Sequence, residues 1–121
     1  VYWNHMIQTR GLQDHVIKEG WVDDIDAWLE DKSFLISTSV HESFGYNIAE
    51  AMAKGIKPVI HNFYGASGLY PKELLFSDLD DLVTLIKGDY CSCDYNKWVR
   101  NNFNLEDSIY KIDKFVTKLK D

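Results

Sequence analysis

The sequence predicts an α/β fold in which a parallel β-sheet carries helices on both faces. Short apolar runs of strand length alternate with segments of helical periodicity, and this order favours parallel strands connected by helices. The run at 33–38 is continuous, as in a strand that is covered on both sides, and 56–61 is a second candidate for a buried strand. Because the 121 residues contain no internal repeat and no low-complexity tract, we expect a single domain over residues 1–121.

Four segments have the length and the composition of strands. The expected strands are 15–22, with a turn at Gly20, 33–38, 56–61 and 73–76. Between the last two, residues 62–71 are polar and contain glycine, so we expect a long loop there.

Five segments place their apolar side chains on one helical face. The expected helices are 2–10, 25–32, 46–54, 79–87 and 105–120. The N-cap candidates are Asp23 or Asp24, Asp78 and Asn104, and the helix stops are Gly11, Gly55 and Gly88. In the last helix, the stripe that we expect to be buried consists of Ile109, Ile112, Val116 and Leu119. Residues 89–98 are either irregular or open a further helix.

Composition and charge exclude several classes of partner. The net charge is −6 and the pI is near 5.1, which argues against a general nucleic-acid binder because such a protein needs a basic face. No apolar run approaches the roughly 18 residues that a membrane span requires. There is no cysteine framework of a secreted protein, so we expect a cytoplasmic location.

The only two cysteines, Cys91 and Cys93, are separated by one residue. Neither a second pair nor a histidine at ligand spacing accompanies them, and two ligands cannot fill the tetrahedral shell of zinc. We therefore expect no metal site.

The stretch "STSVHESFGYNIAEAMAKG", residues 37–55, joins an expected strand to an expected helix. The turn between them lies beyond the carboxyl end of a parallel strand, where open α/β sheets bind ligands. Gly45 allows a tight turn or the close approach of a ligand. The free N–H groups of Gly45, Tyr46 and Asn47 at the start of the helix would attract a phosphate.

Two carboxylates accompany this turn. Glu50 lies about one turn inside the helix and can accept hydrogen bonds from a vicinal diol such as a ribose. Glu42 lies in the turn itself, where a neutral group rich in hydroxyls is a suitable partner, and we expect both carboxylates to face one crevice. Ser39 either ends its strand or contacts the ligand, and His41 either stabilises the turn or contacts the ligand.

A longer pattern runs through this region: a serine, Glu-x-Phe-Gly, a second glutamate eight positions after the first, Ala-Met-Ala, a glycine and Pro-Val-Ile. The residues that form it are Ser39, Glu42, Phe44, Gly45, Glu50, Ala51, Met52, Ala53, Gly55, Pro58, Val59 and Ile60. The pattern resembles the donor-binding half of retaining glycosyltransferases of the GT-B fold, and more narrowly the glycosyl transferases group 1 family. "EGWVDDIDAWLED" is similar to the Gly-x-Val segment of that family, so the resemblance covers 11–88 and is strongest over 34–65.

The resemblance implies a role for each residue in binding a nucleoside diphosphate sugar, with no cofactor besides that donor. Glu50 would hold the ribose, and Glu42 would lie at the donor sugar as the candidate catalytic carboxylate. The turn from Phe44 to Asn47 would offer its amides to the sugar or the diphosphate, and Val22 would lie near the base. Anomeric configuration would be retained, and the family needs no metal in general.

The resemblance also implies that the chain is the C-terminal, Rossmann-like half of a longer enzyme. The basic Arg and Lys pair of the family matches no residue here, and the N-terminal domain that binds the acceptor, a glycan or a lipid-linked sugar, is missing from the sequence. We therefore expect this fragment to be inactive alone. The whole enzyme could lie at the inner face of the membrane. The alternatives are another GT-B enzyme, such as a sugar-nucleotide epimerase or a phosphorylase-like protein, and a non-catalytic interaction module.

Overall fold

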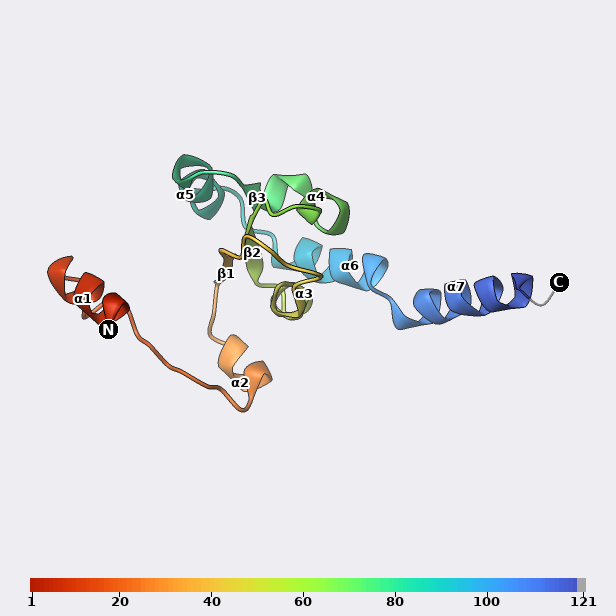
Figure 1. Cartoon of the computed structure of the whole chain (residues 1–121), viewed down its shortest axis with the longest axis horizontal. Coiled ribbons are helices and arrows are strands. Elements are labelled where there is room, and N and C mark those ends of the chain that lie inside the picture. Colours follow the sequence, from red (N-terminus) through yellow and green to blue (C-terminus); the bar gives the residue numbers. More distant parts are fainter. Residues whose placement is uncertain (120–121) are drawn as a thin grey trace.

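The computed structural model describes residues 1–119 and contains a three-stranded parallel sheet (Figure 1). The strands are β1 (Phe34–Ser37), β2 (Lys57–His61) and β3 (Leu75–Phe76), and they lie side by side in the order β1-β2-β3. In the register of the sheet, Ser37 pairs with Ile60, and Ile60 pairs with Leu75. Helices flank this parallel sheet, which confirms the predicted α/β class.

Seven α-helices and one 3-10 helix are present among the described residues. They are α1 (Tyr2–Thr9), α2 (Ile25–Leu29), α3 (Tyr46–Ala53), α4 (Ala66–Leu69), η1 (Lys72–Leu74), α5 (Leu79–Lys87), α6 (Ser92–Asn102) and α7 (Leu105–Lys118). Three predicted N-caps are confirmed, since the side chains of Asp24, Asp78 and Asn104 accept hydrogen bonds from backbone N–H groups in the first turns of α2, α5 and α7. The segment 89–98 opens α6.

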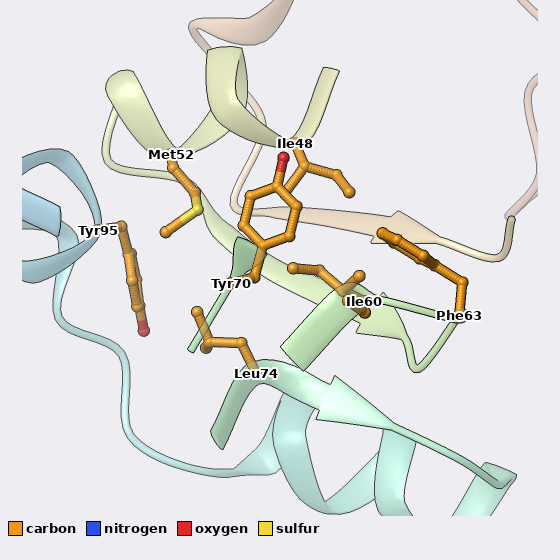
Figure 2. Close-up of a cluster of buried hydrophobic side chains, with 8 residues drawn as sticks. Ile48, Met52, Ile60, Phe63, Tyr70, Leu74 and Tyr95 are labelled. Atoms are coloured by element: carbon orange, nitrogen blue, oxygen red, sulfur yellow. The ribbon is translucent and has the colours of Figure 1, made fainter. Parts of the chain in front are cut away.

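The main core lies on one face of the sheet, between β2 and the helices α3 and α6. Ile60 of β2 packs there with Ile48 and Met52 of α3 and with Tyr95 of α6, and Figure 2 shows Tyr70 lying among them. These side chains are at most 8% exposed. Because α3 follows β1 directly, this packing fixes the turn between β1 and α3 against the sheet.

The opposite face of the sheet is covered at β2 and β3 by α5. Lys57, the first residue of β2, is buried there, and its Nζ donates to the carbonyl oxygens of Leu85 at 2.5 Å and Asp89 at 2.6 Å. These carbonyls lie in the last turn of α5 and just beyond it, where a cation is favourable. Helices therefore cover both faces, but Ile36 of β1 stays 46% exposed. The prediction that the strand at 33–38 is covered on both sides is therefore wrong for Ile36.

The predicted strand over 15–22 is wrong: the structure has no strand in this segment. Figure 1 shows α1 and the following segment extending away from the sheet. A strand needs a neighbouring backbone for its ladder of hydrogen bonds. In the described part of the chain, β2 is the strand that pairs with β1, and no strand pairs with residues 15–22.

Two predicted elements after β2 differ in extent. The expected strand 73–76 is reduced to Leu75–Phe76, because η1 occupies the residues before it. The expected loop 62–71 contains the single turn of α4. Both differences are local, and the chain still returns to the sheet beside β2.

The last predicted helix forms as α7, but its apolar stripe is not buried. Ile109, Ile112, Val116 and Leu119 are between 43% and 71% exposed, because α7 leaves the sheet in the direction opposite to α1 (Figure 1). None of the described helices combines the length and the apolar character that crossing a bilayer demands.

Candidate functional site

The candidate site lies at the carboxyl edge of the sheet, where β1 and β2 end. The two loops that leave these strands are held together there: His61 Nδ1 lies 3.2 Å from the carbonyl oxygen of Ser39. On the other side of β2, the N–H of Asn62 donates to the carbonyl oxygen of Phe76 at 2.8 Å. Polar residues after two neighbouring parallel strands therefore share one edge, as the order of strands and helices predicts.

A hollow of about 370 Å³ opens between these loops. Its lining consists of Val40, His41, Glu42, Ser43 and Tyr64. Glu42 is half-buried, whereas the Tyr64 side chain is almost fully exposed. The hollow thus combines one carboxylate, one imidazole and two hydroxyl groups, which can exchange hydrogen bonds with a polyhydroxylated ligand.

The turn beside this hollow depends on glycine. Gly45 has φ +77°, and a Cβ added to it would lie 2.8 Å from Cδ1 of Ile48, a buried side chain of the core. The carbonyl oxygen of Gly45 accepts from the N–H groups of Ile48 and Ala49 and begins α3. Gly45 supplies no side chain to cap the helix, so the first N–H groups of α3 remain available.

Tyr70 holds this turn in place from the opposite side. Its hydroxyl donates to the carbonyl oxygen of Phe44 at 2.6 Å and to that of Gly45 at 3.0 Å. Burial raises the pKa of Tyr70 to about 12, and the negative charge of Glu42 adds to the rise. Tyr70 is not among the predicted site residues, because no local pattern marks it and its contacts span 25 and 26 residues.

The ring of Phe44 anchors the turn instead of lining the Glu42 hollow. It packs edge-to-face against Phe103 with a centroid distance of 4.7 Å and against Tyr46 at 5.1 Å. Aromatic pairs in this geometry contribute about 0.5–1.5 kcal/mol beyond their burial. Phe44 therefore sets the position of the backbone that follows it, while Tyr46 itself is 75% exposed at the start of α3.

The structure does not bring Glu50 and Glu42 into one hollow. Glu50 is exposed and lines two others, one of about 490 Å³ against α6 and one of about 510 Å³ against the start of α2. An ion pair between Lys54 and Asp26, at 3.3 Å, joins α3 to α2 beside the second of these. The two carboxylates are separated because Glu50 lies on α3, past the turn that holds Glu42, so the expected common crevice is not formed.

The remaining predicted residues are Ser39, His41, Asn47 and Val22. Ser39 is half-buried and its carbonyl oxygen contacts His61 Nδ1, whereas His41 and Asn47 are exposed. Val22 is half-buried and lines a hollow of about 760 Å³ between the extended segment and α2. This hollow borders the one at α2 that contains Glu50, because Asp23 and Ile25 line both.

Fold and site together define an α/β domain whose candidate ligand site lies at the carboxyl edge of a parallel sheet. Residues 2–70, more than half of the chain, match the sequence model of the family described as Glycosyl transferases group 1. The chain belongs to this family, which supports glycosyltransferase activity and, in general terms, the binding of a sugar donor and an acceptor. No curated protein and no solved structure matches the chain.

Proposed function

We propose that this chain is the donor-binding domain of a retaining glycosyltransferase of the GT-B fold. The donor is a nucleoside diphosphate sugar, and the acceptor, a glycan or a lipid-linked sugar, binds through another domain of the whole enzyme. The observation that carries the proposal is the family match over 2–70, because it includes the whole turn between β1 and α3 at the carboxyl edge of the sheet.

The diphosphate lies at the start of α3 in this proposal. The N–H groups of Tyr46 and Asn47 are the first of the helix, and the helix dipole adds a partial positive charge there. Gly45 brings the backbone close to the ligand, and Tyr70 and Phe44 fix its position. These donors stabilise the charge that develops on the leaving diphosphate, which lowers the barrier to transfer.

The separation of Glu42 and Glu50 fits the two ends of one extended donor. With the diphosphate between them, the sugar lies in the hollow of Glu42 and His41, and the ribose lies on the opposite side at Glu50. Glu42 orients the sugar hydroxyls at the reacting end and is the catalytic carboxylate of the proposal. The base continues from the ribose into the hollow of Val22, which borders that of Glu50.

A titration of nucleotides into the chain tests this arrangement. We expect nucleoside diphosphates to bind more tightly than the corresponding 2′,3′-dideoxy diphosphates, because the ribose hydroxyls donate to Glu50. Glu50→Gln weakens the ribose nucleotide by about 10-fold or more, since hydrogen bonds to a charged group contribute about 1.5–3 kcal/mol. Calorimetry measures both affinities.

The matched control is Glu106→Gln, which removes an exposed carboxylate from the first turn of α7 that lines none of the hollows assigned to the donor. It should leave both affinities unchanged. If Glu50→Gln tightens the binding of every diphosphate equally, Glu50 acts only as a nearby negative charge and the proposed ribose contact is wrong.

A further inference from the structure

Three metal-binding side chains meet at the start of α6, outside the candidate donor site. The Sγ atoms of Cys91 and Cys93 lie 3.3 Å apart, and Cys93 Sγ lies 3.8 Å from a carboxylate oxygen of Asp94. The donor atoms of the three residues all lie within 4.8 Å of one another, and all three residues are exposed. Cysteines and histidines alone predicted no metal site, and Asp94 was not among the ligands considered in that prediction.

The backbone at this point places the two thiols on the same side of the helix start. Cys91 is the N-cap residue of α6, and Asp94 lies three positions further on. These are the positions of a capping box, in which both side chains would bond to backbone N–H groups. The Cys91 side chain makes no such cap bond, so its sulfur remains available to face Cys93.

The position of Cys91 is also fixed by the core. Its N–H donates to the hydroxyl of Tyr95 at 3.2 Å, and Tyr95 packs its ring among the buried residues of the main core. The carbonyl oxygen of Cys91 accepts from the N–H of Asp94 at 3.1 Å. Two hydrogen bonds thus hold the backbone on which the donor groups stand, which reduces the conformational entropy that a ligand must remove.

The spacing of the donor atoms matches a tetrahedral ion. With Zn–S bonds of about 2.3 Å and a Zn–O bond of about 2.0 Å, tetrahedral angles place two sulfurs about 3.8 Å apart and a sulfur and an oxygen about 3.5 Å apart. The observed distances of 3.3 Å and 3.8 Å lie within about half an ångström of these values. Small rotations about the side-chain bonds therefore complete the geometry.

We propose that Cys91, Cys93 and Asp94 bind one thiophilic divalent cation of the zinc type, with a solvent molecule as the fourth ligand. On binding, both thiols lose their protons to solvent and each sulfur forms one bond to the ion, while the Asp94 carboxylate coordinates through one oxygen. Two thiolates and one carboxylate bring three negative charges to a doubly charged ion. Soft sulfur ligands select zinc or its chemical relatives over magnesium and calcium.

The site lies at the amino end of the sheet, opposite the candidate donor site. Asp89, two residues before Cys91, is bonded through its carbonyl to Lys57 at the first position of β2. The bound ion would therefore stabilise the start of α6, the helix that packs on α3. It would act on the stability of the fold and not on donor chemistry.

The test uses Co²⁺ as a spectroscopic probe for the reduced chain after treatment with a chelator. We expect one Co²⁺ per chain, with an absorption band from sulfur-to-metal charge transfer that Zn²⁺ abolishes by displacement. Cys91→Ser and Cys93→Ser each remove most of this band. Asp94→Asn weakens Co²⁺ binding by about 10-fold or more, because even residues that only support ligands contribute that much to affinity.

The matched control is Asp107→Asn, which removes an exposed carboxylate from the first turn of α7 and should leave the Co²⁺ affinity unchanged. Far-UV circular dichroism establishes that each variant is folded, and a thiol assay establishes that both cysteines are reduced. A chain with two free thiols that shows no charge-transfer band overturns the proposal. So does a stoichiometry of one ion per two chains, or an Asp94→Asn variant that binds as tightly as the parent.

Discussion

A substitution at the junction of α3 and α6 tests how closely these two helices pack. Gly55 follows α3 with φ +77°, in the left-handed region, and is buried against the first residue of α6. A Cβ added to Gly55 would overlap Oγ of Ser92 and would lie 3.1 Å from the Ser92 carbonyl oxygen. Gly55→Ala must therefore strain the backbone and also force the Ser92 hydroxyl to rotate away or the start of α6 to shift.

The two costs can be separated. The left-handed conformation costs a residue with a Cβ about 1–2 kcal/mol, and inserting a methyl group into a packed contact costs about 1–3 kcal/mol. We expect Gly55→Ala to lower the free energy of unfolding by about 2–5 kcal/mol. Ser92→Ala in the same chain removes the overlapping hydroxyl, so the double variant should lose only about 1–3 kcal/mol, mainly from the backbone.

Urea unfolding followed by circular dichroism and tryptophan fluorescence measures these changes. Gly68→Ala is the matched control, because Gly68 lies in α4 without a positive φ and a Cβ there meets no atom within 4 Å. It should be neutral or slightly stabilising. A loss of less than about 0.5 kcal/mol for Gly55→Ala, within the range of ordinary surface substitutions, would refute the described contact between α3 and α6.

Two further predictions concern single buried polar groups. Because the pKa of Tyr70 is raised to about 12, its contribution to stability is complete below the unfolded-state value of about 10 and is lost as pH rises from 10 to 12. Tyr70→Phe should lower the free energy of unfolding at pH 7 by about 1–2 kcal/mol. Urea titrations above pH 10 should also show that the free energy of unfolding falls less steeply with pH in the variant than in the parent chain. An equally steep fall in the two chains would contradict this. Lys57→Met keeps the side-chain volume but leaves the carbonyl oxygens of Leu85 and Asp89 without their donor, so thermal unfolding should show a loss of about 1–3 kcal/mol. Lys87→Met, an exposed residue of α5, is its control and should change stability by less than about 0.5 kcal/mol.

Local signals were sufficient for most elements of the sheet region. Asp78 begins α5 as predicted because a cap bond spans only three residues, and Tyr46 begins α3 because Gly45 precedes it. The continuous apolar run at 56–61 forms β2, in which Lys57 to Ile60 are buried. Local chemistry also gave the turn that joins β1 to α3, and the residue pattern of that turn led to the family that the comparison then showed.

Partners distant in sequence decided the remaining features. Residues 15–22 have the composition of a strand, but no described strand pairs with them. The stripe of α7 has helical periodicity, which determines that a helix forms but not what its apolar face contacts. Tyr70 was not predicted for the same reason, since nothing near it in the sequence indicates that its hydroxyl donates to the turn at Gly45.

By itself, the sequence determined the α/β class, the caps and the turn between β1 and α3, because these depend on backbone preferences and hydrogen bonds within a few residues. The tertiary structure alone decided that Glu42 and Glu50 line separate hollows, that Phe44 anchors the turn, and that Cys91, Cys93 and Asp94 converge. The first two depend on packing between elements and the third on side-chain directions at the start of α6, and spacing along the chain does not specify either.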